Sequence, residues 1–96
     1  MRYQRVQWHQ NSPELPRVLY SEIGDDGWEV RKVDEYANGH CDIAGAEIET
    51  GRTFLGLDRV PPLDEINDDP QFEGAEISAD EFEAIWAHAK DGFGLP

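Results

Sequence analysis

Residues 17–48 read RVLYSEIGDDGWEVRKVDEYANGHCDIAGAEI, and this stretch decides the fold. It holds three runs rich in β-branched and aromatic residues, separated by GDDG and by Asn38-Gly39. The runs lie at 17–23, 28–37 and 40–48. Asn and Gly tolerate the positive φ of a tight hairpin, so we expect a type I′ turn at Asn38-Gly39. The stretch therefore predicts three consecutive antiparallel strands.

The register of the first hairpin follows if residues 26–27 form a two-residue turn. Glu22 then lies opposite Arg31 as a charge pair, and Ile23 lies opposite Val30 as an apolar pair on the other face. A longer turn would shift this register, and a slip of one residue would exchange the two faces.

Two further strands extend the sheet. Residues 3–9 place Val6 and Trp8 on one face of a half-buried first strand. After a turn at 49–51, residues 52–57 predict a short fifth strand. We therefore expect five strands that meander in chain order.

The last third of the chain predicts one long helix. Residues 63–66 form at most one helical turn, and a long loop follows it. Ser78 is a typical N-cap with Glu81 as its capping-box partner, and Gly92 ends the helix. The apolar side that should face the sheet consists of Phe82, Ile85, Trp86 and Ala89. Residues 1–96 thus predict a single α+β domain, an antiparallel meander sheet of about five strands covered by one C-terminal α-helix.

Acidic residues dominate the composition. The chain carries 21 carboxylates against eight Lys and Arg, for a net charge of −13. Residues 1–59 hold 11 acids and seven bases, a net of −4, whereas residues 60–96 hold ten acids and Lys90 alone, a net of −9. Direct nucleic-acid binding is excluded because it depends on basic side chains that release counterions from phosphates. The partner that this charge favours is a basic protein or a nucleic-acid-binding protein complex.

Metal and catalytic motifs are not found in the sequence. His40 and Cys41 are strand neighbours whose side chains point to opposite faces, and His9 and His88 have no ligand at a suitable spacing. The paired aspartates fall in turns without a nucleophile or a phosphate loop beside them. We expect no cofactor, no metal and no enzymatic activity.

The compartment is predicted from two features. The lone Cys41 cannot form an internal disulfide, which suits a reducing compartment. No run approaches the length of a membrane span, and residues 1–6 look like a strand rather than a signal peptide. We expect a cytoplasmic protein that does not bind membranes and is a monomer or a homodimer.

One of the three tryptophans is a candidate contact residue. An exposed aromatic rimmed by carboxylates suits an interface with a cationic protein, and Trp28 beside the acidic turn is the best placed. The predicted partner-binding residues are Trp28, Asp25, Asp26, Asp64, Glu65, Asp68, Asp69, Glu73, Glu76, Asp80 and Glu83.

Four segments together carry a family resemblance: RVQW at 5–8, VLYSEI at 18–23, DGWEVRKV at 26–33 and EISADEFE at 76–83. They resemble a family of small uncharacterised bacterial proteins common in actinomycetes. The resemblance implies a bacterial origin and a single-domain fold, and it implies no activity and no catalytic residues.

Three functional hypotheses follow. The first is an acidic inhibitor that acts by charge mimicry of DNA, either an immunity protein for a cationic toxin or a phage-type inhibitor, such as an anti-CRISPR, of a nucleic-acid-binding defence complex. The second is a small regulatory or scaffold domain that binds through an apolar patch or a sheet edge. The third is an enzyme that uses a carboxylate pair. Salt dependence of binding separates the first from the second.

Overall fold

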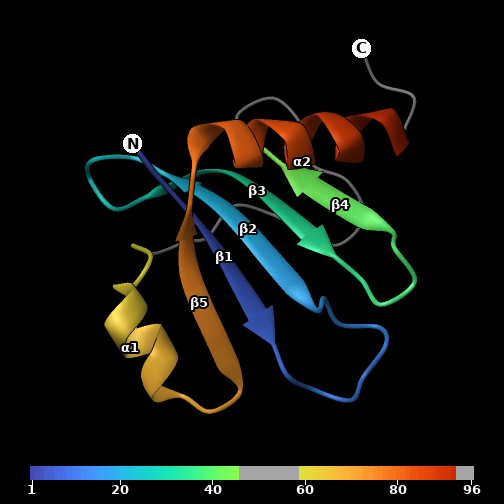
Figure 1. Ribbon diagram of the computed structural model, residues 1–96, viewed down its shortest axis with the longest axis horizontal. Helices are drawn as coiled ribbons and strands as arrows, with labels where there is room; N and C mark the ends of the chain where they lie inside the picture. The colour runs from blue at the N-terminus through green and yellow to red at the C-terminus, as the bar shows by residue number, and fades with distance from the viewer. Residues whose placement is uncertain (46–58, 93–96) are drawn as a thin grey trace.

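The computed structural model describes residues 1–45 and 59–92 of the chain. Its elements in chain order are β1 (Arg2–Trp8), β2 (Val18–Ile23), β3 (Glu29–Glu35), β4 (Cys41–Ala44), α1 (Leu63–Asp68), β5 (Phe72–Ile77) and α2 (Ala79–Gly92). The strands form one antiparallel sheet in the order β4-β3-β2-β1-β5, and α2 lies across it (Figure 1). The predicted α+β class, five-stranded antiparallel sheet and C-terminal helix are confirmed.

A strand forms where the sequence predicted a loop, and the sheet does not follow chain order throughout. Residues 72–77, read as part of a long loop, form β5, and β5 pairs with β1 rather than with β4. Gly74 and three charged or small neighbours gave this segment little strand character, and its partner is remote in sequence. The strand predicted at 52–57 lies outside the described residues.

The hairpin between β3 and β4 confirms a turn at Asn38-Gly39 but not its type. Gly39 has a φ of +89°, whereas no described non-Gly residue has a positive φ, so the predicted type I′ turn is wrong. Tyr36 N–H donates to His40 O, and Gly39 N–H donates to Tyr36 O. The loop is therefore three residues long, with glycine in the left-handed position.

The β2–β3 hairpin repeats this design. Gly24 N–H donates to the Trp28 carbonyl, and Gly27 has a φ of +85°. The Asp26 carboxylate accepts a hydrogen bond from Trp28 N–H at 3.1 Å, which fixes the turn from inside.

A β-bulge shifts the register of the same hairpin by one residue. Ile23 pairs with Glu29 next to the three-residue loop, and the register shifts so that Glu22 pairs with Arg31. The predicted Glu22–Arg31 pair is confirmed, whereas the Ile23–Val30 pair is wrong because Val30 is the extra residue of the bulge.

One face of the sheet packs against α2. Ser78 caps this helix through its hydroxyl, which accepts Glu81 N–H at 3.1 Å, as predicted. α2 is described as far as Gly92, the last described residue, so the predicted end of the helix there is not tested. The side that faces the sheet is the predicted one: Phe82 and Ala89 are buried, and Ile85 and Trp86 pack beside the core cluster of Val33, Cys41 and Ile43.

The opposite face is covered as well, which the expected one-sided sheet did not include. α1 contacts β5 on the face that carries Val6, since a Cβ placed on Gly74 would lie 2.7 Å from Leu63 Cδ2 and 3.5 Å from Val6 Cγ2. Val6, Ile23 and Ala44 are buried on this second face, together with the polar side chains of Gln4 and Ser21. Among the described residues, no helix has the length and apolarity to cross a membrane.

Candidate functional site

The sheet edge formed by β5 lies beside α1 (Figure 1) and carries many carboxylates. This acidic edge collects six of the predicted residues: Asp64, Glu65, Asp68, Asp69, Glu73 and Glu76. All but Asp69 are exposed. Residues far apart in an extended chain are thus placed on one side of the molecule by the contact between α1 and β5.

Most of these carboxylates face solvent without a counter-charge. Glu73 lies 3.3 Å from His9 Nε2, and Asp69 accepts a hydrogen bond from Gln71 N–H at 2.9 Å. Within the described ranges, Asp64, Asp68 and Glu76 make no ion pair. They remain available to a cationic partner.

The backbone hydrogen-bonding groups at the centre of the β5 edge already have partners. Gly74 N–H donates to Asn67 Oδ1 at 2.6 Å, and Asn67 Nδ2 donates to Gly74 O at 3.2 Å. The Asn67 amide therefore imitates a neighbouring strand, and Phe72 N–H is taken by the Asp69 carbonyl. This arrangement opposes the addition of a foreign strand at β5.

Trp28, Asp25 and Asp26 lie together in the β2–β3 hairpin. Trp28 is 40 % exposed, while Trp8 and Trp86 are half-buried, so the expectation that Trp28 is the exposed tryptophan is confirmed. The Asp25 carboxylate lies 2.8 Å from the Met1 amino group, and Asp26 is used in the turn. All three residues are exposed, and within this group Trp28 supplies the apolar surface open to a partner.

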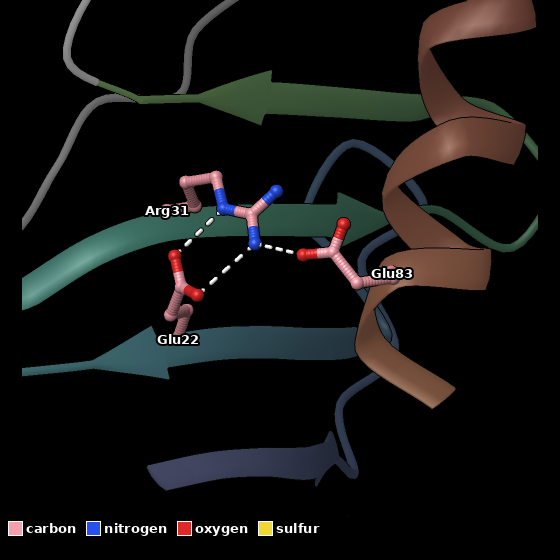
Figure 2. Close-up of polar contacts among 3 residues, drawn as sticks. All are labelled: Glu22, Arg31 and Glu83. Carbon is pink, nitrogen blue, oxygen red and sulfur yellow. Dashed lines mark hydrogen bonds and ion pairs between the residues drawn. The ribbon is translucent and has the colours of Figure 1, made fainter. Parts of the chain in front are cut away.

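Glu83, also predicted to bind a partner, is exposed at the surface but already paired with a residue of the sheet. Figure 2 shows the Arg31 guanidinium between Glu22 and Glu83. Arg31 donates to both oxygens of Glu22 at 2.7 and 3.0 Å and also bonds Glu83 on α2. Asp80, one turn earlier on α2, is exposed.

The Arg31 cluster is also stacked and electrostatically coupled. Arg31 Cζ lies 5.0 Å from the ring centroids of both Phe82 and Trp86. The Arg31 hydrogen bonds hold the pKa of Glu22 below its usual value, and a hydrogen bond from Tyr3 adds to this while raising the pKa of Tyr3. Every charge in the cluster is satisfied, so it ties α2 to the sheet and offers no reactive group.

Cys41, His40 and His88 border a common hollow near the β3–β4 turn. Burial raises the pKa of the Cys41 thiol to about 11, helped by the charges of Glu35 and Asp42. His40 Nε2 lies 3.0 Å from the buried Asp42 carboxylate. In the part of the chain that the structure describes, no three His, Cys, Asp or Glu side chains are grouped to hold a metal.

Sequence reasoning missed a cavity on the second face of the sheet. It lies between β1, β2 and β3 on one side and α1 with Val60 and Pro61 on the other. Gln4 and Ser21 line it from the sheet. The signal was present, because Gln4 shares the face of Val6 by strand alternation, but a polar residue in a strand is normally expected to face solvent.

These features define a small acidic α+β domain with an exposed carboxylate edge and a fully satisfied arginine cluster. Compared with known families, the chain matches a domain of unknown function (DUF6881) over residues 2–91, and it belongs to that family. This agrees with the predicted resemblance to an uncharacterised family. Comparisons with curated proteins and with solved structures gave no match.

Proposed function

We propose that this chain is a small cytoplasmic bacterial protein that binds a basic protein and blocks its cationic groove by charge mimicry. The partner is a cationic toxin or a nucleic-acid-binding defence complex. The observation that carries the proposal is the acidic edge, where Asp64, Asp68 and Glu76 are exposed and make no ion pair within the described residues.

Charge on a fixed scaffold suits this role better than charge on a loose tail. The two Asn67–Gly74 hydrogen bonds hold α1 against β5, so the carboxylates keep their spacing in the free protein. Preorganised like charges raise the association rate with an oppositely charged surface, by about 10- to 1,000-fold in steered complexes. The exposed Trp28 supplies an apolar anchor outside this edge.

The alternative of a regulatory domain that recruits a partner strand has less support at β5, because the Asn67 amide fills its centre. Binding by strand addition or through an apolar patch would also depend little on salt. The two modes therefore differ in a measurable way.

The test is a pull-down from the source cell with two matched triple variants. The first is Asp64→Lys/Asp68→Lys/Glu76→Lys. The control is Glu81→Lys/Asp91→Lys/Glu14→Lys, which makes the same change in net charge. Each triple variant replaces one acidic residue in the first turn of a helix and one near the end of that helix, in α1 for the first variant and in α2 for the control.

A basic partner should be captured by the wild type and by the control at low salt and be lost with the first variant. It should also be depleted at about 0.5 M salt, where the Debye length is only a few Å. Equal capture by both triple variants, or capture that is indifferent to salt, would reject the acidic edge as the binding surface.

A further inference from the structure

The cavity on the second face of the sheet has the size of a ligand site. Its volume is about 440 Å³, within the roughly 300–1,000 Å³ that is usual for small-molecule pockets. It shares Glu65 and Asp69 with the acidic edge, but its other walls are mainly apolar. Those walls are formed by Val6, Leu19, Val60, Pro61, Ile66 and Phe72.

A small polar group lies among these apolar walls. It comes from the three central strands and consists of Gln4, Ser21, Glu29 and Lys32. Ser21 Oγ donates to Glu29 Oε2 at 2.8 Å, so the serine hydroxyl has its partner inside the protein. Lys32 Nζ lies 3.6 Å from Asp34 Oδ1.

Gln4 differs from its neighbours. Its residue surface is only 4 % exposed, and its side-chain amide has no hydrogen-bond partner among the described residues. Among the described residues, the amide nitrogen and oxygen of Gln4 are not sealed off from solvent, so they are open to the cavity that the residue lines. Because Gln4 lines the cavity, a molecule in the cavity can supply both the donor and the acceptor that the amide lacks.

The charges around the cavity select against anions. An anion would meet Glu29, and near α1 it would also meet Glu65 and Asp69. Lys32 is the one basic residue among the described residues of the lining, and its ammonium lies beside Asp34. A molecule without a negative charge avoids the repulsion and keeps the apolar contacts.

We propose that this cavity binds a small molecule that carries no negative charge and has an apolar body and one amide-like edge, which pairs with the Gln4 side chain. Glu65 and Asp69 border both the cavity and the acidic edge. The three residues that carry the proposed function, Asp64, Asp68 and Glu76, do not line the cavity, so either proposal can fail without the other.

The test uses benzamide as the probe and follows the amide cross-peaks of the ¹⁵N-labelled full chain by NMR. Benzoate serves as an anionic counterpart of nearly the same size. Benzamide should shift the cross-peaks of Gln4, Ser21 and Phe72, with a Kd on the order of 1 mM, as expected for so small a ligand. Benzoate should bind at least about fivefold more weakly, since it meets the carboxylates of the lining.

Gln4→Leu should weaken benzamide binding by at least about fivefold, because the amide contact is lost. Gln7→Leu is the matched control, as it makes the same change in the same strand on the other face, where the side chain is exposed. If Gln4→Leu does not fold, the wild-type titration still decides. Benzamide shifts that map elsewhere or are absent, tighter binding of benzoate, or unchanged affinity in a folded Gln4→Leu chain would each overturn the proposal.

Discussion

The guanidinium of Arg31 and the carboxylate of Glu22 face each other across the β2–β3 pair and share two hydrogen bonds of 2.7 and 3.0 Å. The Glu22 side chain is 8 % exposed and that of Arg31 is 22 % exposed. Since Arg31 also contacts the Phe82 and Trp86 rings, the pair joins the sheet to α2. A salt bridge that is largely removed from water is costly to break from one side.

Arg31→Met should destabilise the domain by about 3 kcal/mol, because it leaves Glu22 buried without its counter-charge. Glu83→Gln should cost less than about 1 kcal/mol, since that carboxylate is more than half exposed. Urea unfolding at pH 7 measures both. Equal costs for the two substitutions would contradict the assigned roles.

The stabilisation from Glu22 should depend on pH in a defined direction. Its folded pKa is lowered by Arg31, so its contribution is present above the unfolded value of about 4.3 and is lost as the pH falls through the folded pKa. The difference in unfolding free energy between wild type and Glu22→Gln should therefore shrink from pH 7 to pH 3. Glu14→Gln, at an exposed loop position, is the control and should match wild type at both pH values.

Cys41 should resist alkylation in the folded state. With a pKa of about 11, about one thiol in a thousand is ionised at pH 8, against about a quarter for an ordinary thiol of pKa 8.5. Iodoacetamide at pH 8 should modify the native chain at least about 100-fold more slowly than the chain in urea. Similar rates in the two conditions would show that the thiol is neither buried nor shifted.

Trp28 should account for most of the tryptophan fluorescence that acrylamide quenches, because it is 40 % exposed. Trp28→Phe should lower the Stern–Volmer slope, whereas Trp8→Phe and Trp86→Phe should raise it by removing half-buried emitters. Acrylamide is uncharged, so the net charge of −13 does not bias the comparison. A slope that falls most with Trp86→Phe would place the exposed ring on α2 instead.

Asn67→Ala should weaken the attachment of α1 to β5 without unfolding the domain. The loss of two solvent-accessible hydrogen bonds costs about 1 kcal/mol, and exchange of the Gly74 amide hydrogen should become faster. Asn11→Ala, in an exposed loop, is the control. Unchanged protection at Gly74 would mean that α1 is not held by this amide.

Local signals in the sequence were sufficient for much of the fold. The hairpins depend on Gly27 and Gly39, whose positive φ is a property of residue type, and the Ser78 cap follows from its own three-residue spacing. The pair between β1 and β5 is different, because it joins residues such as Val6 and Gly74 that no short window contains together. Such pairing is decided by the tertiary context.

The candidate site was predictable only in composition. The carboxylates of the acidic edge could be named from the sequence, but the involvement of Glu83 with Arg31 and of Asp25 with Met1 depends on the arrangement of α2 and β1. The cavity was missed because the burial of Gln4 results from α1 covering the second face. Alternation along β1 places Gln4 on the same face as Val6, but only the fold shows that α1 covers this face.

The place of β5 beside β1 has a consequence for synthesis on the ribosome. β1 is translated first, but it gains its second neighbour, β5, only when residues 72–77 have been translated. Until then the nascent chain exposes the β1 edge, which is the kind of unpaired strand that associates with other chains. The sheet therefore closes only after residues 72–77 have left the ribosome, and a chain stopped before residue 72 should be bound by chaperones where the 96-residue chain is not.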